Sequence, residues 1–382
     1  MRLRTLLPSL VLATIGIRAE GQQYVLSATP VVTISGETDP SAQFKTLLGI
    51  GRFASGEIAL GTFDPVGINL FSASGSFVRP LARPGAGPGE LRMPHFFGRH
   101  ADSVVTFDLG LRRVTFFAGN GASRQTLVRL PVVRGRIPVV AGVLPTGALL
   151  VAQVPYLGST APDGPARDRH ALLVIPADTA ATAVPLGEFA GYGVVYYTIP
   201  ASHELSFALD VLNTGTSYLV VGSEVAIADP DKPEVVFLHA DGALARRVAL
   251  PIRSRPFDPA AVREARKLAT AAAPTEQTAA RAAQDKARFD LMFDLSKRPK
   301  AAPYFRRLVR ATDGSVWVEL YREHIGRPAE YLRIDAGSRV SARLSAPANV
   351  QFHEFGADYA LGVRVDPDTD VQSIVLYALR RR

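Results

Sequence analysis

The chain has 382 residues, of which 47% are hydrophobic and 20% charged, so it can bury a large core and lacks the composition of a disordered segment. Its formal net charge of +8 comes from an excess of arginine, but the arginines are scattered, which indicates a solvated surface rather than a nucleic-acid-binding face. The sequence contains no cysteine, which excludes disulfide bonds, a lipid-attachment cysteine and thiolate metal sites.

Residues 1–21 have the pattern of an export signal. Two arginines lie in the first four residues, an apolar stretch follows from Thr5 to Ile17, and Ala19-Glu20-Gly21 is a small-x-small cleavage pattern. The apolar stretch is too short to span a bilayer, and no later stretch has the roughly 18 apolar residues that a membrane helix needs. We expect a cleaved signal peptide and a periplasmic or secreted protein, with an uncleaved leader at the membrane as the alternative.

Short apolar strands recur along the rest of the chain. One set begins at turn residues, at Ser55, Ala101, Thr146, Gly215, Asp313 and Gly356, and each member is followed by a second apolar strand. The intervals are 46, 45, 69, 98 and 43 residues, so the natural unit is about 45 residues long, which is typical of a four-stranded propeller blade. The sequence therefore predicts an all-β protein, a six-bladed β-propeller across residues 22–382.

Two intervals are longer than the unit, and the extra residues can be located. The third unit contains a polar hairpin at 158–169, and the longest interval contains the alanine-rich segment 258–297. Asp258 followed by a proline predicts a helix start, while Pro274 separates a second helix that Thr275 can cap. We predict an inserted α-helical hairpin, which either caps the channel or covers an apolar flank.

The two ends of the chain are expected to complete one blade together. The last unit ends with Ile374-VLYAL and lacks an outer strand, whereas residues 24–35 form a strand with no unit of their own. Pairing the two segments would close the ring and remove the open sheet edges. Residues 24–35 are therefore predicted to close the propeller with the last blade.

One segment carries a resemblance to a known repeat. Arg83-PGAGPGELRMP, followed by the strand pair that ends in Arg113-VTFFAGNG, is similar to the NHL-type repeat. The whole chain resembles exported bacterial six-bladed β-propeller proteins with NHL and TolB-like repeats, in particular those with a helical insertion before Tyr304. Because such proteins mostly bind partners or ligands, the resemblance implies a binding function rather than a particular reaction.

Ligands of propellers usually meet the loops at the end of the central channel, so polar residues near the inner strands are the candidates for a binding site. Histidines from several inner strands could also hold a metal, but no pair has metalloprotease spacing, and we predict no metal, no cofactor and no catalytic residue. The candidate ligand-binding residues are His95, His203, Tyr304, Arg307, His353 and Glu354.

The sequence thus predicts an exported, monomeric binding or scaffold protein. Its partner would be a protein, peptide or glycan at the loop face of the channel, with no nucleic acid and no membrane span. The alternative is a hydrolase, lactonase or lyase with a metal or an acid–base pair in the channel, which would need histidines and carboxylates that converge from several strands.

Overall fold

The computed structural model describes residues 22–128, 130–131, 133–155, 162–177, 182–213, 215–271 and 278–382. The predicted signal peptide, residues 1–21, lies outside the described residues. So do Pro274, Thr275 and the first part of the predicted hairpin at 158–169.

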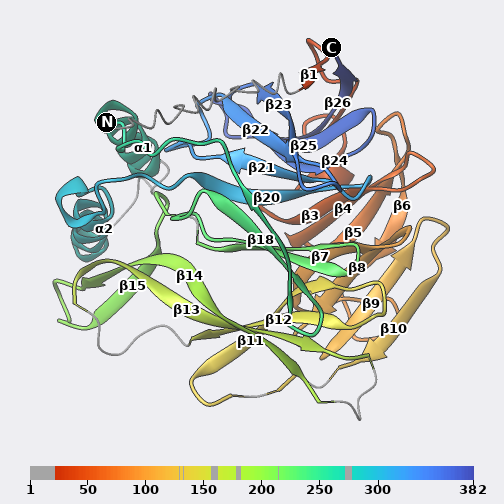
Figure 1. The fold of residues 1–382 in the computed structure, drawn as a ribbon, viewed down its shortest axis with the longest axis horizontal. Helices are drawn as coiled ribbons and strands as arrows, with labels where there is room; N and C mark the ends of the chain where they lie inside the picture. Colours follow the sequence, from red (N-terminus) through yellow and green to blue (C-terminus); the bar gives the residue numbers. More distant parts are fainter. Residues whose placement is uncertain are drawn as a thin grey trace, which may run out of the picture.

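Four antiparallel sheets each contain strands that follow one another in the chain (Figure 1). The first sheet contains β3 (Thr46–Arg52), β4 (Ile58–Asp64), β5 (Val66–Phe71) and β6 (Phe77–Ala82). The second contains β7 (Pro94–His100), β8 (Ser103–Asp108), β9 (Arg113–Ala118) and β10 (Ser123–Leu127). The third contains β11 (Arg136–Val143), β12 (Leu149–Pro155), β13 (Gly164–Ile175), β14 (Val184–Thr198) and β15 (Leu205–Leu209). The fourth contains β16 (Ser217–Val221), β17 (Glu224–Ala228), β18 (Glu234–His239) and β19 (Leu244–Ala249).

The fifth sheet joins the two ends of the chain. In hydrogen-bonded order it contains β1 (Gln22–Leu26), β23 (Val340–Ala346), β22 (Ala329–Ile334), β21 (Val316–Leu320), β20 (Phe305–Ala311), β24 (Val350–Phe355), β25 (Tyr359–Val365), β26 (Gln372–Arg381) and β2 (Val32–Ser35). Strand β1 pairs with both β23 and β26, so eight of these nine strands form a closed ring of pairings. Residues 24–35 supply most of β1 and all of β2, and β2 pairs antiparallel with β26.

The prediction of a six-bladed propeller is wrong. The described strands form five hydrogen-bonded sheets, because β20 and β24 pair in parallel and β1 links β23 to β26. These pairings satisfy backbone groups that separate blades would leave open at their edges. They merge the strands between residues 305 and 381 into one large sheet instead of two separate blades.

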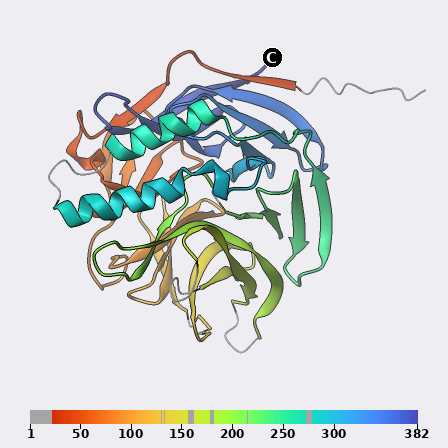
Figure 2. The same cartoon turned by 90° about the vertical axis from the view of Figure 1, so that its left-hand side faces the viewer.

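The arrangement of the sheets is nevertheless propeller-like. Each sheet packs beside the next around a common axis, and the strands nearest the axis contact one another in turn (Figures 1 and 2). These inner contacts join β3 to β7, β7 to β11, β11 to β16, β16 to β20, β20 to β24 and β24 back to β3. The inner strands therefore surround a central space, and their side chains can meet there.

The core lies between the faces of neighbouring sheets. Phe53, Leu70 and Phe117 pack together between the first and second sheets, and similar clusters fill the spaces between the other pairs. Inside the nine-stranded sheet, Trp317 stacks on Phe355 at a ring distance of 4.5 Å, and Tyr24 of β1 meets Trp317 edge-on at 5.4 Å. Because Tyr24 is itself buried, burial of its ring anchors the first strand to the sheet.

Two helices lie between β19 and β20, within the range predicted for the insertion: α1 (Pro259–Ala271) and α2 (Ala279–Met292). Asp258 caps α1, because its Oδ1 accepts a hydrogen bond from Ala260 N at 2.9 Å, and Thr278 caps α2. No described helix is long and apolar enough to cross a membrane.

The helix pair packs on the third sheet rather than standing free. Phe289 and Met292 of α2 join a buried cluster with Val195 of β14 and Tyr321. Figure 2 shows the two helices lying across the face of the molecule that is turned to the viewer. Arg298, just after α2, donates to both carboxylate oxygens of Asp210 at 2.7 and 2.8 Å, which fixes the insertion to the end of β15.

Candidate functional site

Three of the predicted site residues lie away from the central space. His95 is exposed on β7, with its ring 6.0 Å from that of Phe63. His203 is exposed in the turn between β14 and β15 and has a φ of 57°. Tyr304 lines a separate hollow beside Tyr321, before the start of β20. The structure therefore does not bring these three side chains together.

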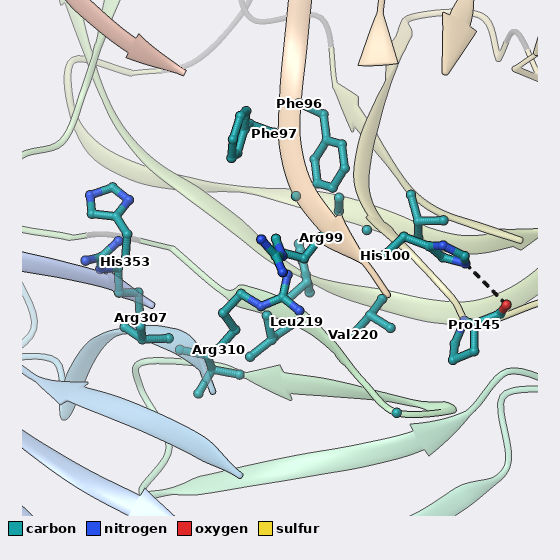
Figure 3. A pocket seen from close by; sticks show the side chains of 18 of the residues that line it. Phe96, Phe97, Arg99, His100, Pro145, Leu219, Val220, Arg307, Arg310 and His353 are labelled. Carbon is teal, nitrogen blue, oxygen red and sulfur yellow. Dashed lines mark hydrogen bonds between the residues drawn. The ribbon is translucent and has the colours of Figure 1, made fainter. Parts of the chain in front are cut away.

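The other three predicted residues lie at or near the axis. Arg307 of β20 and His353 of β24 line one cavity of about 560 Å³, which we call the central cavity. Glu354 is adjacent in sequence to His353 but does not line this cavity, because it is fully buried. Figure 3 shows Arg307 and His353 beside each other at one side of the central cavity.

The central cavity occupies the ends at which the inner strands turn into hairpins. Ala101, Pro145 and Gly222 in these turns lie in its wall. The helical insertion instead leads into the start of β20 at Phe305, and Arg310 lies five residues further along this strand, roughly 17 Å away. The helices thus lie toward the opposite end of the axis, where they run across the face shown in Figure 2, and none of their described residues lines the central cavity.

Two arginines that the sequence analysis did not select dominate the central cavity. Arg99 comes from β7 and Arg310 from β20, and in Figure 3 their guanidinium groups lie beside one another. The Arg99 side chain is only 8% exposed, and its one ion pair, with Asp102, is long at 3.4 Å and half open to solvent. Arg99 Nη1 is buried and has no hydrogen-bond partner in the described part of the protein.

Arg310 has still less compensation. Its Nε is buried without a partner, and no acceptor among the described residues hydrogen-bonds to its guanidinium group. Burial lowers the pKa of Arg310, the charge of Glu354 partly offsets this, and Arg99 lowers it further. The guanidinium groups of Arg99 and Arg310 thus lie close together in a partly buried site. Each destabilises the protonated, charged form of the other.

Arg307, in contrast, has its charge balanced. Its Nε donates to Glu319 Oε2 at 2.9 Å, and Arg322 donates to the other carboxylate oxygen at 3.0 Å. Burial alone would raise the pKa of Glu319, but the charges of Arg307 and Arg322 outweigh burial and lower it overall. Glu319 therefore stays ionised and holds Arg307 in the cavity wall.

His353 is uncharged at neutral pH. Burial, and secondly the neighbouring charge of Arg307, lower the pKa of its imidazole to about 3. The ring lines the central cavity, and no described residue hydrogen-bonds to it. It can therefore offer a ligand one hydrogen-bond donor and one acceptor, but it is a weak base at pH 7.

Glu354 supports the site from behind. Its Oε1 accepts hydrogen bonds from the Tyr359 hydroxyl at 2.7 Å and from Arg52 N at 3.1 Å, while its Oε2 is buried without a partner. Burial, and secondly the charge of Glu354, raise the pKa of Tyr359. Glu354 and His353 thus have separate surroundings and do not form the acid–base pair that an enzyme of the alternative class would need.

The described residues contain no cluster of three or more histidines, aspartates and glutamates that could hold a metal ion. What the central cavity does offer is positive charge, since Arg99, Arg307 and Arg310 line it and no carboxylate does. The arrangement suits the binding of a negatively charged group by charge-assisted hydrogen bonds.

Sequence reasoning selected Arg307 but missed Arg99 and Arg310, because it considered most arginines as scattered surface residues. One signal was available: each arginine lies near the end of an inner strand, directly before the turn that opens the repeated strand. Equivalent positions in neighbouring repeats converge on the axis of a propeller-like fold. A comparison of these positions across the repeats would have placed both arginines in the channel.

Comparison with known proteins assigns no family. No family model and no curated protein matches the chain, so the resemblance to NHL and TolB-like repeats gains no support from them. Among solved structures, a protein from Bacteroides fragilis described as exported is 14% identical, over 94% of this chain and 95% of that chain, with a TM-score of 0.49. A gluconolactonase from Xanthomonas campestris is 11% identical over 95% and 96% of the chains, with a TM-score of 0.45. Virginiamycin B lyase from Staphylococcus aureus is 10% identical over 94% and 99%, with a TM-score of 0.42. All three TM-scores lie below 0.5, so neither fold nor function is assigned from these likenesses.

Proposed function

We propose that this chain is an exported binding protein that holds an anion in the central cavity, between Arg99 and Arg310. One observation carries the proposal: both guanidinium groups have a buried N–H without an acceptor, and they lie side by side. An uncompensated cation is costly to bury, and a second one beside it adds repulsion. A bound anion would supply the missing acceptors and remove the repulsion.

The neighbourhood of the pair favours binding over catalysis. His353 is a weak base at neutral pH, and Glu354 is buried behind the cavity with Tyr359 and Arg52 as partners. Glu354 does not line the cavity, and His353 has a pKa too low for it to take a proton from a ligand at neutral pH. The two arginines can orient and neutralise a negatively charged group without further chemistry.

The export part of the proposal rests on the leader in residues 1–21. Mass spectrometry of the protein from its native host should give an amino terminus near Gln22. A product that retains Met1 in the cytoplasm would contradict export and leave the anion site untouched.

The anion site is tested by calorimetric titration of inorganic phosphate into the wild-type protein and into Arg310→Gln. Charge-assisted hydrogen bonds contribute about 1.5–3 kcal/mol each, so we expect the variant to bind phosphate roughly 10- to 150-fold more weakly. Arg99→Gln should have a similar effect. Binding to the wild type should also weaken as chloride is added, because the arginines are the source of the attraction.

Arg247→Gln is a suitable control for these variants. Arg247 lies on the outer strand β19, and its side chain is exposed and paired with Glu234. The control should bind phosphate like the wild type. If the wild type binds no phosphate, or if Arg247→Gln and Arg310→Gln weaken binding equally, the proposed site is wrong.

A further inference from the structure

The central cavity is much larger than an inorganic anion requires. Its volume of about 560 Å³ lies within the range of roughly 300–1,000 Å³ that is typical of small-molecule sites. A phosphate or carboxylate group between the two arginines would fill only a small part of the cavity.

The rest of the wall is largely apolar. Phe96 and Phe97 of β7 line the cavity from opposite faces of that strand and pack partly against the buried clusters on either side of it. Leu219 and Val220 lie near Arg310, and Arg99 is between them and the phenylalanines in Figure 3. Apolar surface that stays in contact with water is stabilised when an apolar group covers it, at roughly 25 cal/mol for each Å² removed from water. The cavity thus combines one cationic place with an apolar one.

Glycines hold the two aromatic rings in place. A β-carbon added to Gly49 or to Gly61 would lie 2.6 Å from a ring atom of Phe97, and one added to Gly98 would overlap the ring of Phe96. Phe97 therefore sits in a slot that two neighbouring strands leave open by lacking side chains. The aromatic side of the cavity is built in advance and does not depend on a ligand to order it.

Arg99 and Arg310 are the arginines of the cavity whose charge is least balanced. Glu319 balances Arg307 and His353 is uncharged, whereas Arg99 has only the solvent-exposed Asp102 at 3.4 Å, and Arg310 has no hydrogen-bonded carboxylate among the described residues. A ligand with negative charges at both ends would place one of them against the phenylalanines. The cavity fits a ligand with one anionic group.

From these features we infer that the ligand is an organic anion with one phosphate or carboxylate group and an apolar ring body. The anionic group binds Arg99 and Arg310, and the ring lies against Phe97. This inference rests on the proposed function, since it names the class of ligand for the same cavity.

The test compares two phosphate monoesters that carry the same charge, methyl phosphate and phenyl phosphate, by calorimetric titration of the wild-type protein. Burial of a ring the size of a phenylalanine side chain stabilises by an amount that corresponds to about 10- to 100-fold in affinity. We therefore expect phenyl phosphate to bind at least tenfold more tightly than methyl phosphate. This comparison needs no variant.

Variants then locate the two parts of the ligand. Phe97→Leu should weaken phenyl phosphate and leave methyl phosphate unchanged, whereas Arg310→Gln should weaken both esters. Phe207→Leu is the matched control, because the Phe207 ring lies on the edge strand β15 with 40% of its surface exposed. Thermal unfolding of each variant shows whether it is folded.

The two proposals fail in different ways. Equal affinity for the two esters, with both lost in Arg310→Gln, would overturn the ring-bearing ligand and keep the anion site. A preference for phenyl phosphate that survives in Phe97→Leu would place the ring elsewhere and would also overturn the inference. Binding of both esters that is unaffected by Arg310→Gln would overturn the anion site itself.

Discussion

Replacement of Asp210 by asparagine tests whether the helical insertion is fixed to the sheets by a buried ion pair. The carboxylate of Asp210 and the guanidinium of Arg298 are 1% and 2% exposed, and two hydrogen bonds of 2.7 and 2.8 Å join them. Arg298 also donates to the carbonyl of Met292, the last residue of α2. The substitution keeps the shape of the side chain but leaves the buried guanidinium without its counter-charge.

Removal of one partner of a buried ion pair costs about 3–5 kcal/mol, because the other charge stays buried and unpaired. At about 2 °C per kcal/mol for a chain of this size, Asp210→Asn should lower the melting temperature by roughly 6–10 °C. Arg298→Met should have a similar effect. The double variant should lose at least about 2 kcal/mol less than the sum of the two single losses, because neither charge then remains alone.

The assay is urea unfolding followed by circular dichroism. The wild type, Asp210→Asn, Arg298→Met and the double variant form a double-mutant cycle and are measured side by side. Arg343→Met is the matched control, since Arg343 forms an exposed ion pair with Glu330 and should change stability by less than about 1 kcal/mol. Additive losses in the double variant, or single losses as small as that of the control, would refute the reasoning that the pair fixes the insertion.

Three further predictions concern the core, the chain end and pH. Gly61→Ala should destabilise the protein by about 1–3 kcal/mol, measured by urea unfolding, because the added β-carbon would collide with the ring of Phe97. An unchanged urea midpoint would mean that this ring is free to move. Deletion of residues 22–35 should lower the melting temperature and promote aggregation seen by light scattering, because it uncovers β26; a melting temperature equal to that of the wild type would contradict the pairings of β1 and β2. The pKa of His353 is about 3 in the folded protein, whereas an unfolded histidine binds a proton below about pH 6.5, so the free energy of unfolding should decrease as the pH falls between these values. His353→Gln should reduce that decrease. An identical pH profile of stability in the variant would refute this prediction.

Local features were predictable from the sequence because short-range physics determines them. Asp258 caps α1 as expected, because the side chain and the N–H groups it accepts from are two and three residues apart. The strand after the turn at Asp313 was also predictable, because it repeats the pattern of a turn followed by apolar residues, and its Trp317 is buried against Phe355. In both cases, neighbours in the chain carry the information.

The count of sheets was not predictable, because it depends on pairings between distant segments. The sequence pattern shows that residues near Tyr24 form a strand, but not that this strand bonds to both β23 and β26. The edge of a strand can pair with any strand that has unpaired backbone groups. The alternation of apolar residues does not determine which strand that is.

The candidate site was only partly predictable for a related reason. Arg307 and His353 were selected and do line the central cavity, whereas Arg99 and Arg310 were overlooked. Each arginine of the overlooked pair has a buried N–H group without an acceptor beside the cavity, and this property depends on the surroundings rather than on the residue. The charge of Arg307 is balanced by Glu319 on the neighbouring strand, and a sequence does not show that Arg310 has no such hydrogen-bonded carboxylate among the described residues.

The seam formed by β1, β2 and β26 has a consequence for the rate at which the protein folds. Roughly 340 to 360 residues separate the partners of this seam, and Arg382 N bonds to Gln23 O at 2.8 Å at its outer end. Closing a loop of this length costs about 5 kcal/mol of chain entropy, compared with about 2 kcal/mol for a loop of ten residues. The hairpins within each sheet should therefore form early and the seam last. The lifetime of the folded protein against proteases would then be governed by how often this one seam opens.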